Sequence, residues 1–212
     1  MVGKLTINGI DIYSQYKVSI ERIVGLHDFL DIKNPVVNEW KDEHGVEVYL
    51  DTVYYEPREI TLNCFIEGNS AQNFQYNLKQ FYNLIASPEL KYMRIKDMVM
   101  GYLIYLSGAG TITRITKLNS SKVIGRFSIK LKEPYPVNRQ FVTTNQIVQI
   151  TISCTKRLTI WWGDGTKTTV KGTSQVKSKD YGSTGTRYIV IYGSVETITS
   201  ITVTGATELV LS

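Results

Sequence analysis

Side chains that could carry out chemistry are few in this sequence, and they are not arranged in catalytic patterns. The two histidines, His27 and His44, lie in turn-like segments without a flanking carboxylate–serine or cysteine partner. A nucleophile needs a base within reach, and general acid–base catalysis usually needs a histidine or a matched carboxylate pair. We therefore expect no catalytic residue and predict that the protein is not an enzyme.

Metal and cofactor sites are also not indicated. No Cys and His residues have metal-ligand spacing, and Gly108 and Gly110 form a turn without the helix or lysine of a phosphate-binding loop. Asp164 alone falls short of the roughly six to eight oxygen ligands of calcium. Cys64 and Cys154 each alternate with apolar residues, so we expect buried free thiols. The sequence predicts neither a metal nor a cofactor.

Composition places the chain among globular proteins. Its 212 residues suffice for one large domain or two small ones, and 42% of them are hydrophobic. No run approaches the roughly 20 apolar residues of a membrane helix, and the N-terminus has no secretory signal. The net charge is +5, of which residues 142–212 hold +3, without a basic block. We expect no membrane insertion, no sequence-specific nucleic-acid binding and synthesis without export.

The first two thirds of the chain have the pattern of an antiparallel sheet with one helix. Short alternations over residues 4–24 and a loop or hairpin arm over 25–42 precede a strand at 59–66. A capping Ser70 and an apolar stripe predict a helix that ends at Ser87 and Pro88. Four further strands complete a meander, at 92–95, 98–106, 111–118 and 123–132.

This region resembles the N-terminal domain of phage distal tail proteins over residues 1–138. The residues that carry the resemblance are Lys-Leu-Thr-Ile-Asn-Gly at 4–9, the strand–helix run at 59–87, and Gly-Arg-Phe-Ser-Ile-Lys-Leu-Lys-Glu-Pro-Tyr-Pro at 125–136. The resemblance implies a hub that joins the tail tube to the baseplate, and a six-fold ring in which sheet edges pair between neighbours. It also implies tail-tube and baseplate proteins as partners, and a place in the virion tail after assembly in the host cytoplasm.

The last third of the chain is expected to form a separate small β-sandwich over residues 139–212. Residues 137–144 are predicted to be a linker. Short strands separated by turns indicate the sandwich, and they are expected at 147–154, 158–162, 168–170, 187–192 and 198–204, with a possible sixth at 208–211. The fold class is therefore mainly β, with an N-terminal antiparallel sheet or sandwich and one helix followed by an all-β domain.

A second resemblance is carried by two motifs of this region, which is similar to the polycystic-kidney-disease-type (PKD-like, Ig-like) sandwich domain. The residues that carry it are Trp161, Trp162, Gly163, Asp164, Gly165 and Thr166, followed by Tyr181, Gly185 and Tyr188. Asp164 and Gly165 suit a tight turn. Because Leu158, Ile160 and Trp162 share one face of a strand, we expect Trp162 in the core and Trp161 exposed.

An exposed Trp161 permits two interpretations. Its ring could be a platform on which a sugar stacks, or it could pack against a neighbouring strand or subunit. The leading hypothesis is a structural component of a phage or prophage tail, a ring-forming hub with a peripheral sandwich that binds partners or the host surface. The alternative is a carbohydrate-binding or adhesion protein that uses the sandwich to bind host surface glycans. A secreted enzyme accessory module that has lost its leader is a third possibility.

Overall fold

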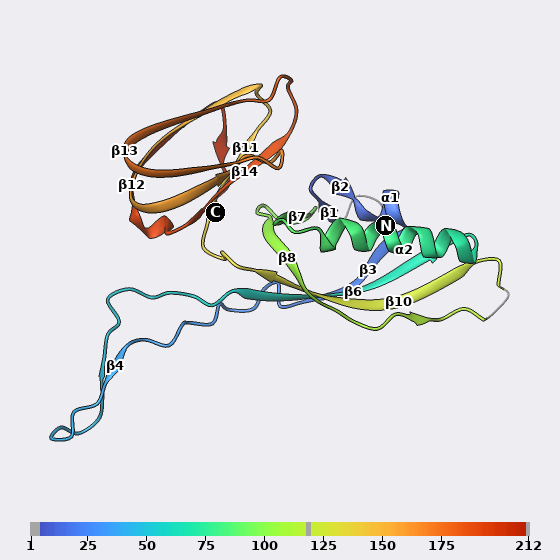
Figure 1. Ribbon diagram of the computed structural model, residues 1–212, viewed down its shortest axis with the longest axis horizontal. Coiled ribbons are helices and arrows are strands. Elements are labelled where there is room, and N and C mark those ends of the chain that lie inside the picture. The colour runs from blue at the N-terminus through green and yellow to red at the C-terminus, as the bar shows by residue number, and fades with distance from the viewer. Residues whose placement is uncertain (1–4, 118–119, 211–212) are drawn as a thin grey trace.

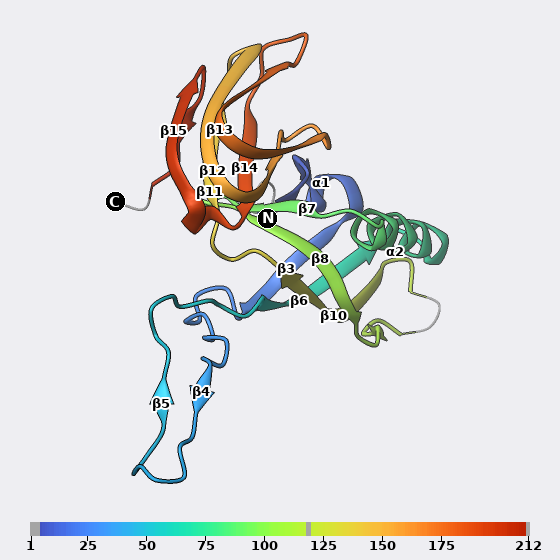
Figure 2. The same cartoon turned by 60° about the vertical axis from the view of Figure 1, so that its left-hand side comes forward.

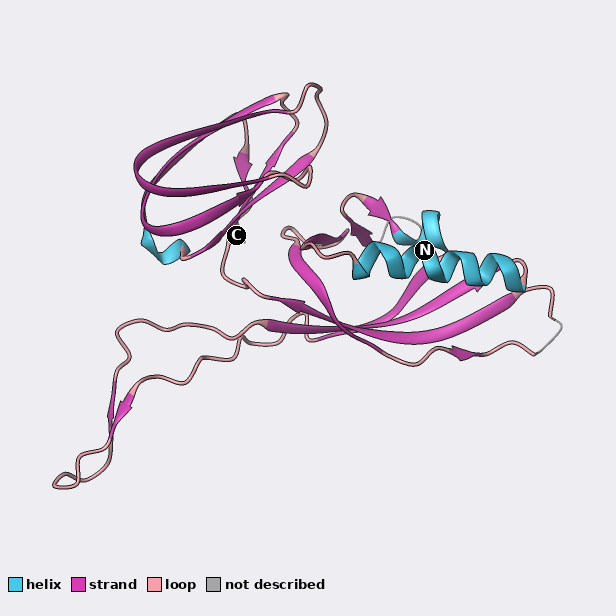
Figure 3. Ribbon diagram, viewed as in Figure 1, coloured by secondary structure: helices cyan, strands magenta, loops and turns pink. Residues whose placement is uncertain are grey.

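The protein consists of two antiparallel β-sheets in tandem, each with its own hydrophobic core, and a long arm that leaves the first sheet (Figures 1 and 3). The computed structural model describes residues 5–117 and 120–210. The mainly β fold predicted from the sequence is confirmed. Lys4, Leu118 and Leu211, which fall in expected strands, lie outside the described residues.

The first sheet has eight strands, in the order β2-β1-β7-β8-β10-β6-β3 with β9 paired to β10. Its strands are β1 (Leu5–Ile7), β2 (Ile10–Asp11), β3 (Val18–Val24), β6 (Arg58–Gly68), β7 (Lys91–Ile95), β8 (Tyr102–Ala109), β9 (Thr113–Arg114) and β10 (Val123–Glu133). Strands β6 and β10 pair over eleven residues each, and their side chains alternate between the core and the other face. The expected meander is thus present, although the strand expected at 111–118 is reduced to the two residues of β9.

Helix α2 (Ala71–Ala86) covers the core face of this sheet (Figure 1). Ser70 caps it by accepting a hydrogen bond from the backbone N–H of Asn73 at 3.1 Å, and the helix ends at Ser87, as the sequence predicts. Phe81 points into the core and its ring lies 5.8 Å from that of Phe127. A second, five-residue helix, α1 (Ile12–Tyr16), was not expected, because it interrupts a segment that reads as short strands.

The chain between β3 and β6 forms a long extended arm, here defined as residues 27–56. Its only strands are β4 (Val37–Asn38) and β5 (Glu47–Val48), which pair with each other. Near the base, a single bridge joins Ile32 to Tyr55. Two views show that the arm points away from both sheets (Figures 1 and 2). The hairpin arm expected from residue 25 is therefore present and extends well beyond residue 42.

The second sheet has six strands, in the order β13-β12-β14-β11-β16 with β15 paired to β12. They are β11 (Arg139–Thr143), β12 (Ile147–Trp161), β13 (Lys167–Asp180), β14 (Arg187–Gly193), β15 (Ile198–Thr204) and β16 (Thr207–Glu208), with a 3₁₀ turn at Val195–Thr197. The prediction of a linker at 137–144 is wrong, because β11 pairs with both β14 and β16. The sixth strand appears as β16, one residue earlier than expected.

Strand β12 pairs with different neighbours along its length. Its first half pairs with β15 and its last four residues pair with β14, while β13 follows it on the other side. The register of its pairing with β13 shifts twice between Ile152 and Leu158. The sequence suggested two separate strands here, because the exposed residues 155–157 interrupt the apolar alternation. A bulge of this kind changes the direction of a strand, so that its two halves can pair with different strands, here β15 and β14.

We expect Ser70→Ala to lower the free energy of unfolding by about 1 kcal/mol, because the mutation removes the side-chain acceptor at the start of α2. Urea denaturation measures this loss. Ser121→Ala is the matched control, since Ser121 is exposed and precedes a strand rather than a helix. Equal stability of the two variants would contradict the cap.

Candidate functional site: the junction of the two sheets and the arm

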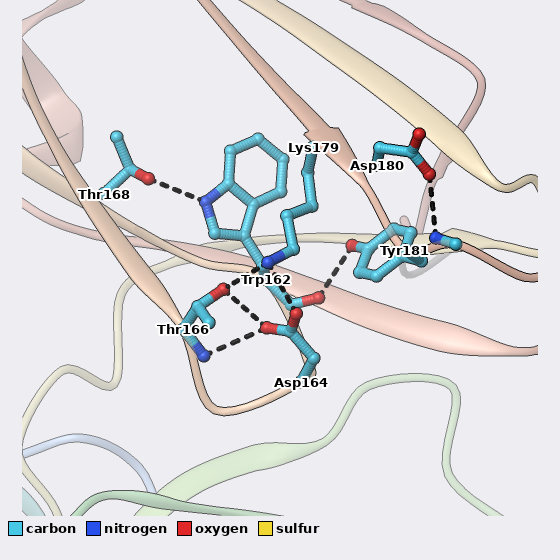
Figure 4. A network of polar contacts seen from close by, with 8 residues as sticks. Trp162, Asp164, Thr166, Thr168, Lys179, Asp180 and Tyr181 are labelled. Carbon is cyan, nitrogen blue, oxygen red and sulfur yellow. Dashed lines mark hydrogen bonds and ion pairs between the residues drawn. The ribbon is translucent and has the colours of Figure 1, made fainter.

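The Trp-Trp-Gly-Asp-Gly-Thr segment forms a tight, internally bonded turn between β12 and β13 (Figure 4). The carboxylate of Asp164 accepts hydrogen bonds from the Thr166 N–H at 2.9 Å and from the Thr166 hydroxyl at 2.6 Å. Gly163 and Gly165 both have positive φ, and at Gly163 a Cβ would also collide with the backbone of Tyr188. The turn therefore needs these residue types for its own geometry.

Lys179, near the end of β13, and Tyr181, which directly follows that strand, both contact this turn (Figure 4). Lys179 lies 2.7 Å from Asp164, and the Tyr181 hydroxyl donates to the Trp162 carbonyl oxygen at 2.7 Å. Partial burial opposes ionisation of Asp164, but hydrogen bonds from Lys179 and Thr166 outweigh it and lower the pKa of Asp164. These polar groups satisfy one another, so the motif acts as a structural clasp.

The two tryptophans are both buried, which corrects one expectation. Trp162 lies in the core of the second sheet, and its indole N–H donates to the Thr168 hydroxyl at 2.8 Å, in agreement with the prediction. Trp161 was expected to be exposed as a possible ligand platform, but only 3% of it is accessible. The reason is that its side of the second sheet packs against the first sheet. Trp161 instead packs against a neighbouring strand, which was the alternative interpretation of this residue.

An aromatic cluster, here called the seam, joins the two sheets. It consists of buried residues from both sheets: Tyr92 and Leu103 from the first, and Trp161, Val190 and Tyr192 from the second. The Tyr92 ring lies 5.4 Å from that of Trp161 and 5.3 Å from that of Tyr188. Burial, together with the neighbouring Tyr188, raises the pKa of Tyr92, so this phenol stays neutral.

Gln140 of β11 fixes the geometry of the seam. Its amide oxygen accepts from the Tyr92 hydroxyl at 3.0 Å and from the Gly101 N–H at 2.9 Å. Its amide nitrogen donates to the Gly101 carbonyl at 2.7 Å and to Asn138 at 2.9 Å. A fully bonded side chain that is 1% exposed specifies one relative position of the two sheets.

The seam was missed at the level of sequence, although a signal for it exists. Residues 189–192 are buried one after another, and Trp161 and Trp162 are buried side by side. Consecutive buried residues on a strand mean that both of its faces are covered. An uninterrupted apolar run therefore indicates a second packing partner for the strand. Gln140 lies in the expected linker, where no pattern in the sequence indicates that it would be buried.

A buried ion pair lies where the arm meets the first sheet. Arg58 Nε and Glu133 Oε2 are 3.2 Å apart, and Arg58 also donates to the Leu26 carbonyl oxygen across the base of the arm. Burial raises the pKa of Glu133 to about 7, while Arg58 and Asn138 act in the opposite direction. Glu133 is the last residue of β10, so this pair connects the arm to the segment that leads into the second sheet.

Other expected residues are placed apart from this junction. Gly185 lies in the connection before β14, where its N–H donates to the Thr144 carbonyl at 3.3 Å. Cys64 and Cys154 are buried free thiols. Within residues 5–117 and 120–210, no three His, Cys, Asp or Glu side chains are grouped as metal ligands. Neither helix in the described part of the chain is long and apolar enough to cross a membrane.

A comparison with protein families matches one segment of the chain, which begins in the arm and continues into the first sheet. Residues 41–132 match the family described as "Phage tail protein RIFT-related domain". This match confirms the expected resemblance to phage tail proteins and supports a structural role in a phage tail. The matched segment spans the second half of the arm through most of β10 and excludes the second sheet. The resemblance of residues 139–212 to a PKD-like domain stays a prediction.

The other comparisons add little. No curated protein sequence matches the chain. Among solved structures, the chain is similar to the Dit protein of phage SPP1, described as a paradigm of hub adsorption apparatus in Gram-positive infecting phages. The TM-score is 0.48 at 10% sequence identity, covering 98% of this chain and 99% of that one. A similarity at this level does not by itself assign a function.

We expect Trp162→Ala to cost about 3–5 kcal/mol of folding free energy, because it empties a large volume of the second core. Urea denaturation again measures the loss. Trp40→Ala, in the arm, is the control and should change stability by less than about 0.5 kcal/mol, since Trp40 is half exposed. A cost below about 1 kcal/mol for Trp162→Ala would show that this ring is not a core residue.

The buried Glu133 predicts a pH dependence. Its pKa rises from an ordinary value of 4.5 to about 7 on folding, so the folded state binds more protons than the unfolded state between these values. The free energy of unfolding should therefore fall as the pH rises from about 5 to 7, and Glu133→Gln should remove this component. Glu59→Gln, at an exposed carboxylate, should retain it. Identical pH profiles for the wild type and Glu133→Gln would rule out this origin.

Proposed function

We propose that the protein is a ring-forming distal tail or baseplate hub component of a phage or prophage tail. In this proposal residues 1–138 form the belt domain of the ring, and residues 139–212 form a peripheral domain that contacts partners or the host surface. The observation that carries the proposal is the match of residues 41–132 to a phage tail protein domain. Tail-tube and baseplate proteins are then the expected partners, in a virion tail that assembles in the host cytoplasm.

The edges of the first sheet support assembly with neighbours. Strand β3 pairs only with β6 among the described residues, so one side of its seven-residue backbone is open to pairing. At the other end of the sheet, β2 is only two residues long. Open strand edges are commonly covered by another chain, and closure of a ring provides every edge with a neighbour. A subunit count of six comes from the resemblance to distal tail proteins.

The seam supports the role of the second sheet as a rigid peripheral unit. A buried, fully hydrogen-bonded Gln140 and an aromatic cluster hold it on the first sheet. With a rigid attachment, the outer domain keeps a fixed position relative to the ring when it contacts another molecule. The alternative of carbohydrate binding depended on an exposed Trp161. Because Trp161 is buried against Tyr92, that function no longer has a residue to support it.

Size-exclusion chromatography with multi-angle light scattering tests the proposal. The chain has a mass of 24.1 kDa, so a six-membered ring has a mass of about 145 kDa. We expect this species to form as the protein concentration rises through the micromolar range, and negative-stain electron microscopy should show closed rings. A monomeric mass at every concentration, with or without tail-tube protein, would contradict the proposal.

A further inference from the structure

The arm has apolar side chains that its own chain does not bury. Of the 25 exposed large hydrophobic residues in the described chain, twelve lie in the 30 residues of the arm. They are Phe29, Ile32, Val36, Val37, Trp40, Val46, Val48, Tyr49, Leu50, Val53, Tyr54 and Tyr55. A two-stranded hairpin is marginally stable alone, and so large an apolar surface marks a contact with another molecule.

The arm is also strongly acidic, whereas the rest of the chain is basic. The arm contains eight acidic and two basic residues, a net charge of −6, and the whole chain has +5, which leaves +11 for the remainder. The ion pairs found among the described residues all lie outside the arm. Glu47 accepts a hydrogen bond from the Trp40 indole within the arm at 3.3 Å, and no lysine or arginine is paired with the arm's carboxylates in the described chain. The remainder of the chain outside the arm has the complementary positive charge, so a second copy of the protein is a suitable partner.

One groove on the protein combines apolar walls with positive charge. It lies between the end of α2, β8 and the start of β13, and is lined by Tyr82, Ile85, Leu90, Tyr105, Leu106 and Lys167 among others, with Glu89 as its acidic lining residue. Tyr82 and Tyr105 are partly exposed. Because the arm points away from the sheets, the groove is not covered by the arm of its own chain (Figures 1 and 2).

A second lysine adds to the positive charge at this groove. The ammonium of Lys91 donates to the Glu89 carbonyl oxygen at 3.1 Å, beside Leu90 in the groove wall. Burial lowers the pKa of Lys91, and the positive charge of Lys167 lowers it further, while Glu89 opposes both. Lys167 and Lys91 together outnumber the single carboxylate of Glu89, so an added carboxylate is stabilised at this place.

The other grooves are less suitable for the arm of a second copy. The one lined by Lys33, Tyr54 and Tyr135 is also apolar and contains Glu196, but Lys33 and residues 53–55 of its own arm already form part of its wall. The one lined by Tyr13, Phe65, Ile115 and Ile124 is apolar, but its charged lining residue is Glu67. The one lined by Arg22 and Arg126 is mostly polar and also contains Glu21. An acidic and apolar hairpin therefore matches the groove at Lys167 better than any of these.

We propose that the arm of one copy docks into the groove beside Lys167 of a second copy. The inference rests on the proposed ring and deepens it, because it names the two surfaces that meet. The surfaces differ, so the contact runs head to tail and can continue around a closed ring. Apolar arm residues cover Tyr82 and Leu106, and arm carboxylates face Lys167, to whose positive charge the buried Lys91 adds.

Cross-linking between two single-cysteine variants tests this contact. Val46→Cys places a thiol on the arm, and Tyr82→Cys places one in the groove, both at exposed positions. The native Cys64 and Cys154 are buried, and burial raises the pKa of the Cys64 thiol to about 12, so they should react little. A short bismaleimide should join the two variants into a dimer only when they are mixed. Val176→Cys, on β13 outside the groove, replaces Tyr82→Cys in the control and should give no cross-link.

Charge reversal tests the electrostatic part with variants that should fold. We expect Lys167→Glu to weaken self-association on the order of fivefold in light scattering. Combining it with Asp42→Lys and Glu43→Lys in the arm should restore association. Lys171→Glu, exposed on the same strand but outside the groove, should have little effect.

The outcomes distinguish this inference from the proposed function. If the wild type forms rings but Lys167→Glu associates equally well and Val46→Cys does not cross-link to Tyr82→Cys, the inference is overturned and the ring is retained. If the wild type stays monomeric at every concentration and no cross-link forms, both fail. Selective cross-linking together with charge rescue supports the contact.

Discussion

The arm imposes the constraint on which the rest of the account depends. Thirty residues leave the first sheet as an extended hairpin with twelve exposed large hydrophobic side chains and a net charge of −6. No core lies beneath it, since its strands β4 and β5 pair only over two residues each. The loss of conformational entropy opposes ordering of such a segment unless contacts with another surface stabilise it. We therefore interpret the chain as one part of an assembly, in which the acidic, apolar arm and the apolar groove beside Lys167 are the proposed complementary surfaces.

The remainder of the structure holds these surfaces in fixed positions. The Arg58–Glu133 pair and the Arg58 bond to Leu26 anchor the base of the arm on the sheet. Gln140 and the seam hold the second sheet, and with it Lys167 at the edge of the groove. Buried polar groups of this kind contribute specificity of position more than stability. The clasp around Asp164 has the same role within the second sheet, because its polar groups bond to one another rather than to a ligand.

Local sequence patterns were sufficient to predict a helix or strand when one face of that element packs against a single core. The alternation of β6 and β10 and the cap and stripe of α2 are set by neighbours in sequence, and they were predicted with nearly correct bounds. The sequence-based predictions were wrong where contacts between segments far apart in the sequence determine the structure. Strand β11 exists because β14 and β16 pair with it, and Trp161 is buried because Tyr92 lies against it. Gln140 has a role that depends on Gly101 and Tyr92, which no local pattern of residues 137–144 contains.

Hydrogen exchange with mass spectrometry, compared between dissociated and assembled protein, tests the central claim most directly. The backbone amides of residues 27–56 should exchange rapidly in the dissociated chain, because few of them are hydrogen-bonded within it. On assembly we expect strong protection of the arm together with the peptides that carry Tyr82 and Lys167, while the buried strands β6 and β14 change little. An arm that exchanges equally fast in both states would contradict the account, since its apolar surface would then remain uncovered in the assembled protein.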